Sequence, residues 1–123
     1  MTKRPTRVQL YWLPHCSTCQ KAKAFLEAQG LKVTLEHDLK ANPLDAATVA
    51  KLAQAVGGAE ALFSKRSMKY RPLGLHEQTL SEAELLAWMV KEYTFIKRPV
   101  MLFDTGAAAC GFSQKTLLAL LQG

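Results

Sequence analysis

The sequence predicts an α/β fold, a four-stranded mixed sheet with flanking helices and an inserted helical segment. Three observations predict it: a strand–helix–strand pattern fills roughly the first forty residues, helical patterns fill the middle, and a hairpin followed by a helix closes the chain. The 123 residues suit one compact domain, which we expect to span residues 1–123. Apolar types make up 49% and charged types 21%, a balance that excludes disordered and fibrous classes.

The first unit is predicted to be a strand, a helix and a second strand. Residues 7–13 alternate in the pattern of a buried strand. Residues 17–29 carry apolar side chains at helical spacing, and Gly30 is the expected C-terminal stop. Residues 31–39 alternate again. Because the connection between the two strands is a short crossover, we expect them to be parallel.

The inserted helical segment is expected at about residues 42–93. Asn42 followed by Pro43 predicts the start of a helix, which should stop at the Gly57-Gly58 pair. A basic loop is then expected over residues 64–76. The Ser81-Glu82-Ala83-Glu84 capping box predicts a helix that runs to about residue 93.

The last segment is predicted to be a β-hairpin and a helix. Residues 100–103 and 107–110 read as strands around a turn at Asp104-Thr105-Gly106, and Ser113 should cap a helix that runs to Leu121. The hairpin makes the sheet mixed. This is the element order of the thioredoxin-like (glutaredoxin-like) fold, with helices inserted between its two halves.

The charge balance favours an anionic partner without naming it. The net charge is +6, and two basic clusters stand out, Lys65, Arg66, Lys69 and Arg71 in one and Lys97 with Arg98 in the other. Either cluster can also be a solvated face. With no zinc-finger spacing and no aromatic ladder, we expect no direct nucleic-acid binding. No stretch approaches the roughly 20 apolar residues of a membrane span, and no secretion-type leader is visible, so we expect a cytoplasmic protein without membrane contact.

The cysteine pair Cys16-Ser17-Thr18-Cys19 is the most informative motif. Three cysteines in so short a chain do not form a structural disulfide framework. The pair can be a redox dithiol or half of a zinc site. A zinc site needs about two more ligands, and neither Cys110 nor any of the three histidines has a partner at ligand spacing. We therefore expect a dithiol and no metal.

Cys16 stands at the predicted strand-to-helix turn, where cysteine chemistry is favoured. The unpaired N–H groups and the positive end of the helix dipole stabilise a thiolate, and lower a cysteine pKa from about 8.5 to between about 3.5 and 7.5. Cys19 lies one turn further on the same face and is expected to be more buried, as a resolving thiol. The first helical N–H groups, near Ser17 and Thr18, can also bind an anion.

Three further residues are each open to two interpretations. His15 either lowers the pKa of Cys16 as an imidazolium or is an exposed turn residue. Cys110 is expected to be a small buried hydrophobe, with a third redox role as the alternative. From sequence alone the bond before Pro99 has trans as its more frequent state, although proline permits cis.

Four segments together resemble the arsenate reductase / Spx family. They are Cys16-Ser17-Thr18-Cys19, Ser64-Lys65-Arg66-Ser67, Tyr70-Arg71-Pro72-Leu73-Gly74-Leu75 and Lys97-Arg98-Pro99. The match spans roughly residues 7–121 in the right order and implies the thioredoxin-like fold.

For the reductase branch, the resemblance implies that Cys16 is the nucleophile on arsenate and that a Cys16–Cys19 disulfide is redox-active. It places Arg98 on the oxyanion, Arg66 in the segment of a second arginine, and a cis bond before Pro99. Thioredoxin, or glutathione with glutaredoxin, would be the external reductant, with no bound cofactor. Trp12 stands where the glutaredoxin-linked enzymes have a histidine, and Gly111-Phe112 follows Cys110 where they have an arginine.

For the Spx branch, the resemblance implies a redox-sensing regulator that binds the α subunit of RNA polymerase. Cys16 and Cys19 match its disulfide pair, Arg66 and Arg98 its basic residues, and Gly58 a glycine of its polymerase-binding surface. The sequence favours a cytoplasmic arsenate reductase, with the regulator and a general thiol–disulfide oxidoreductase as alternatives.

Overall fold

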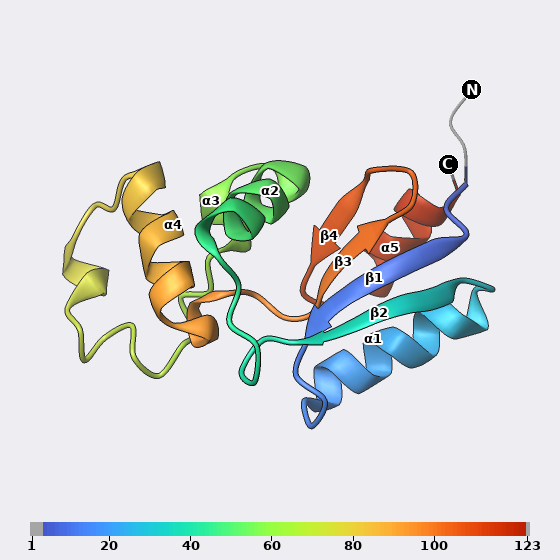
Figure 1. The fold of residues 1–123 in the computed structure, drawn as a ribbon, viewed down its shortest axis with the longest axis horizontal. Coiled ribbons are helices and arrows are strands. Elements are labelled where there is room, and N and C mark those ends of the chain that lie inside the picture. The colour runs from blue at the N-terminus through green and yellow to red at the C-terminus, as the bar shows by residue number, and fades with distance from the viewer. Residues whose placement is uncertain (1–3, 123) are drawn as a thin grey trace.

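The structure, a computed structural model, describes residues 4–122 and contains a four-stranded sheet in the order β2-β1-β3-β4 (Figure 1). β1 (Arg7–Trp12) runs parallel to β2 (Lys32–Asp38) and antiparallel to β3 (Val100–Phe103), and β4 (Ala108–Cys110) is antiparallel to β3. The predicted mixed sheet and its thioredoxin-like order are confirmed.

Helices cover both faces of this sheet (Figure 1). α1 (Ser17–Ala28) and α5 (Gln114–Leu121) pack on one face, and α2 (Ala46–Val56), α3 (Ala59–Leu62) and α4 (Glu82–Lys91) lie on the other side. Because successive strand residues point to opposite faces, β1 supplies both cores. Its residues Val8, Leu10 and Trp12 join the core of α1 and α5, while Tyr11 joins the core of the inserted helices.

The predicted start of α2 at Asn42 was wrong. Asp45 is the N-cap, and its Oδ1 accepts a hydrogen bond from the Thr48 backbone N–H at 2.8 Å. The Asn42 N–H instead donates to the Asp38 carbonyl at 2.9 Å, which closes a turn after β2. Two capping residues therefore competed, and the one nearer the apolar run of the helix prevailed.

The other predicted helix ends agree closely with the structure. Ser81 and Glu84 form the predicted capping box of α4, Ser113 caps α5, and Gly57 ends α2 in the left-handed conformation. α4 ends at Lys91, slightly before the predicted limit, and a short 3-10 turn, η2 (Tyr93–Phe95), follows it. The basic loop ends in a second 3-10 turn, η1 (Leu75–Glu77).

Residues 92–99 form a strap that ties the inserted helices to the sheet. The Ser64 N–H donates to the Phe95 carbonyl at 2.6 Å, and the Lys97 N–H donates to the Leu62 carbonyl at 2.9 Å. The Phe63 and Phe95 rings stack with their centroids 5.0 Å apart. The strap thereby places the start of the basic loop beside the segment that leads into β3. Within residues 4–122, no helix has both the length and the apolar character needed to cross a membrane.

Candidate active site

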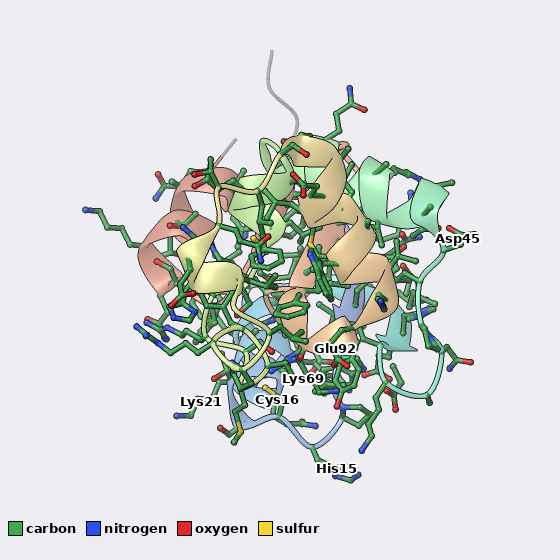
Figure 2. The ribbon with its side chains drawn as sticks, turned by 90° about the vertical axis from the view of Figure 1, so that its left-hand side faces the viewer. His15, Cys16, Lys21, Asp45, Lys69 and Glu92 are labelled. Atoms are coloured by element: carbon green, nitrogen blue, oxygen red, sulfur yellow. The ribbon has the colours of Figure 1, made fainter. Side chains whose placement is uncertain are left out.

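Cys16 is the N-cap residue of α1, at the end of the turn that leaves β1. Its backbone is extended, with φ −84° and ψ 120°, and its N–H donates to the Leu13 carbonyl at 3.1 Å. This geometry places the thiol in front of the first turn of the helix, where backbone N–H groups have no partner inside the helix. Figure 2 shows His15 at the tip of the same turn, pointing away from the protein.

The surroundings of Cys16 stabilise its thiolate. Partial burial by itself raises the pKa of this thiol. Hydrogen bonds from the backbone N–H and the thiol of Cys19 and from the backbone of Thr18, together with the positive charge of Arg98, outweigh that effect, so the pKa lies below the ordinary cysteine value. His15 is exposed and does not contribute to this shift. The helix N-terminus and one arginine thus prepare Cys16 as a nucleophile.

Cys19 lies beneath Cys16 in the core and keeps its proton. The residue has 0% exposed surface, and burial is the largest cause that raises its pKa to about 12. The hydrogen bond to Cys16 and the negative charge there raise it further. The surroundings therefore shift the two sulfurs in opposite directions, toward the thiolate at Cys16 and toward the thiol at Cys19.

Cys16 opens into a cleft of about 810 Å³ between the start of α1, the strap and the basic loop. Its lining contains four cations and several apolar side chains. These are Cys16, Thr18, Glu60, Phe63, Ser64, Lys65, Arg66, Ile96, Lys97, Arg98, Gly111 and Phe112. The excess of cations over the single carboxylate makes the cleft suitable for an anion.

Arg98 is the best-defined candidate for an anion ligand in this cleft. Its Nε and Nη1 atoms are buried and have no hydrogen-bond partner among the atoms of residues 4–122. Buried N–H groups without a partner cost about 1–3 kcal/mol each, so native proteins rarely leave them unpaired. A guanidinium is a planar group of N–H donors that binds oxyanions. The structure therefore holds two N–H donors, on Nε and Nη1, for which the described chain supplies no acceptor.

The structure places some of the remaining predicted site residues in the cleft lining and others outside it. Thr18 and Arg66 line the cleft, and the peptide bond between Arg98 and Pro99 is cis. Ser17 is exposed but does not belong to the cleft lining. Gly58, expected by resemblance on a binding surface, precedes α3 with a positive φ of 129° and is half-buried.

Cys110 is half-buried, not fully buried as the sequence led us to expect. Its Sγ donates a hydrogen bond to the Ala61 carbonyl at 3.2 Å, and burial raises its pKa. It therefore ties β4 to α3 and remains a thiol at neutral pH. Its neighbours Gly111 and Phe112 line the cleft, which Cys110 itself does not.

The sequence did not identify the apolar wall of the cleft. Phe63, Ile96 and Phe112 come from three segments that meet only in the folded chain, and their types are those of ordinary core residues. Among residues 4–122, no three His, Cys, Asp or Glu side chains gather in a way that could hold a metal ion.

Comparisons with known proteins agree with this architecture. The sequence profile of the ArsC family matches residues 11–120. The global transcriptional regulator Spx of Lactiplantibacillus plantarum is 32% identical over 115 residues, which cover 93% of this chain and 86% of that protein. The uncharacterized protein YusI of Bacillus subtilis is 34% identical over 106 residues, which cover 85% of this chain and 89% of that protein. The structure of an arsenate reductase from Vibrio cholerae superposes with a TM-score of 0.79 at 27% identity, with 95% of this chain and 99% of that chain covered.

Proposed function

This chain belongs to the ArsC family, and we propose that it is an arsenate reductase in which Cys16 is the nucleophile and Cys19 the resolving thiol. The single observation that carries the proposal is the pairing of a thiol of lowered pKa with a half-buried guanidinium whose buried Nε and Nη1 have no partner, both at one cleft. An oxyanion held by Arg98 would present its central atom to the thiolate, and the cations of the basic loop would draw it in.

The first chemical step forms a bond between sulfur and arsenic. The Cys16 thiolate attacks arsenic(V), and one arsenate hydroxyl takes a proton from solvent and leaves as water. Arsenic keeps its oxidation state in this step. Arg98, Arg66 and the backbone N–H groups at the start of α1 stabilise the negative charge on the remaining oxygens. Phe63 and Phe112 exclude water from one side of the cleft, which strengthens these contacts.

The second step transfers two electrons to arsenic. Once Cys16 is bound to arsenic, its negative charge and its capacity to accept a hydrogen bond are lost, so two of the causes that raise the pKa of Cys19 disappear. Cys19 releases its proton and attacks the Cys16 sulfur. The electron pair of the S–As bond goes to arsenic, which leaves as arsenite, and a Cys16–Cys19 disulfide remains. Thioredoxin, or glutathione with glutaredoxin, then reduces this disulfide.

Arsenate-dependent consumption of NADPH tests the proposal directly. Purified protein is supplied in parallel with thioredoxin and its reductase, and with glutaredoxin, glutathione and glutathione reductase. We expect turnover by the parent protein, none by Cys16→Ser, and a requirement for glutathione in Cys19→Ser. Failure of both reductant systems with the parent, or full turnover by Cys16→Ser, would overturn the proposal.

A redox-controlled regulator is the second candidate, and the curated relatives favour it. Two Spx regulators are 30% and 32% identical to this chain over 93% of its length. In this role the Cys16–Cys19 pair would switch a surface that binds the α subunit of RNA polymerase. Binding of purified polymerase in only one redox state, without arsenate turnover, would select this candidate. Reduction of insulin disulfides without either of those activities would instead indicate a general thiol–disulfide oxidoreductase.

A further inference from the structure

We infer that the outer face of the basic loop, residues 64–76, is the docking surface for an acidic dithiol protein that reduces the Cys16–Cys19 disulfide. The inference rests on the proposed function, since it concerns the step that restores the reduced enzyme. Three observations carry it: which sulfur is accessible, what the loop exposes, and how the loop is held at the rim of the cleft.

Accessibility decides where a reductant must attack. Cys19 has no exposed surface, whereas Cys16 is half-buried and lines the cleft. A thiolate of the reductant therefore attacks the Cys16 sulfur from the cleft. The S–S bond breaks, Cys19 leaves as a thiolate and takes a proton, and a mixed disulfide joins the two proteins. The second thiol of the reductant then attacks the reductant's first sulfur in the mixed disulfide. Cys16 leaves as a thiolate, and the reductant is left with a disulfide of its own. A protein that reaches into this cleft must contact its rim.

The rim that the basic loop forms is both apolar and strongly cationic. Met68 has 91% of its surface exposed and Leu73 has 46%, which makes them the most exposed large apolar side chains of the described chain. Four cations, Lys65, Arg66, Lys69 and Arg71, flank them in the sequence, and residues 64–76 contain no Asp or Glu. Lys65 and Lys69 pair with Glu60 and Glu92, at 3.9 Å and 2.6 Å. Arg66 and Arg71 form no salt bridge within residues 4–122, and Arg71, which lies outside the cleft lining, remains available to acidic groups of a partner.

Two contacts hold this loop against the strap. Lys69 Nζ donates to Glu92 Oε1 at 2.6 Å, and Figure 2 shows these two side chains close together. The Ser67 and Thr94 hydroxyls lie 2.7 Å apart. Lys65 and Arg66 line the cleft, whereas Met68 and Arg71 are exposed outside its lining, and these two define what we call the outer face of the loop. An apolar centre with a cationic border fits a partner with an apolar patch around its dithiol and an acidic border.

Substitutions in the outer face should weaken reduction of the disulfide by a protein reductant and leave reduction by a small molecule unchanged. The test uses the oxidised full-length protein, thioredoxin kept reduced by its reductase and NADPH, and tris(carboxyethyl)phosphine as a small reductant. For Met68→Glu with Arg71→Glu, we expect the KM for thioredoxin to rise about tenfold, with no change in the rate with the phosphine. The matched control is Leu35→Glu with Lys32→Glu on β2, far from the loop in Figure 1, which should behave like the parent.

The outcomes separate this inference from the proposed function. An unchanged KM for thioredoxin in the loop variant would overturn the docking surface, as would reduction of the parent disulfide by glutathione but not by thioredoxin. Reduction by thioredoxin that depends on the loop, together with an absence of arsenate turnover, would support the docking surface and reject the reductase. Loss of the phosphine reaction in the loop variant would show a disturbed cleft and would also contradict the inference.

Discussion

Cys16 and Cys19 lie one turn apart at the start of α1, and the protein shifts their pKa values in opposite directions. Cys16 accepts hydrogen bonds from the thiol and the backbone N–H of Cys19 and feels the charge of Arg98. Cys19 is enclosed by the core and its pKa rises to about 12, mainly because of burial. One sulfur is thus an available nucleophile, and the other is withheld until the first has reacted.

Oxyanions should stabilise the protein through Arg98. A ligand that binds only the folded state adds about 2.7 kcal/mol of stability at about 100 times its Kd. We expect arsenate and phosphate to raise the melting temperature of the parent, and to leave that of Arg98→Gln unchanged, because the unpartnered guanidinium is their main ligand. Arg71→Gln removes the same charge outside the cleft and serves as the control. Equal shifts in the parent and in Arg98→Gln would contradict this assignment.

Cys110 should not be needed for turnover. Its thiol donates to the Ala61 carbonyl, and a serine hydroxyl can make the same hydrogen bond. We therefore expect Cys110→Ser to keep the parent's rate of arsenate reduction and its rate of alkylation by iodoacetamide at neutral pH. A Cys110→Ser protein that is folded by circular dichroism but has lost turnover would give this cysteine a redox role.

Asp104 should make stability depend on pH in acid. Its carboxylate accepts hydrogen bonds from the Thr6 hydroxyl and from the Thr6 and Arg7 backbone N–H groups, and the Thr6 side chain is the largest cause that lowers its pKa to about 2. A pKa lowered by folding means that the charged form stabilises the fold at pH values above 3.8, and that this contribution is lost as the pH falls toward about 2.

Asp104→Asn should therefore melt at a lower temperature than the parent at neutral pH, and the difference should shrink as the pH falls toward about 2 and vanish below it. Melting curves by circular dichroism across this range measure it. Glu27→Gln, on the exposed side of α1, is the control and should show no such convergence. A difference between Asp104→Asn and the parent that stays constant down to pH 2 would show that the carboxylate charge has no part in it.

Local patterns made most of the fold predictable. The alternation of β1, the capping box at Ser81 and the left-handed end of α2 at Gly57 are each determined by a few consecutive residues, and the structure keeps them. The start of α2 was mispredicted because Asn42-Pro43 and Asp45 both carry start signals. Only the packing of the helix against the core separates such competing caps.

The candidate site was partly predictable for the same reason. The position of Cys16 at a strand-to-helix turn can be read from neighbouring residues. The enclosure of Nε and Nη1 of Arg98 and the wall formed by Phe63, Ile96 and Phe112 depend on segments that are distant in the sequence, so no local signal identifies them. Ser17 shares the same turn as Thr18, but the rotation of the helix directs only Thr18 to the cleft.

The ionisation of Cys16 is the most direct test of the account. In a Cys110→Ser background, the thiolate absorbance is followed against pH, and the alkylated peptide is identified by mass spectrometry. We predict that the pKa of Cys16 lies below the ordinary cysteine value, while Cys19 stays protonated until the pH approaches about 12. A midpoint for Cys16 at or above the usual value would contradict the account.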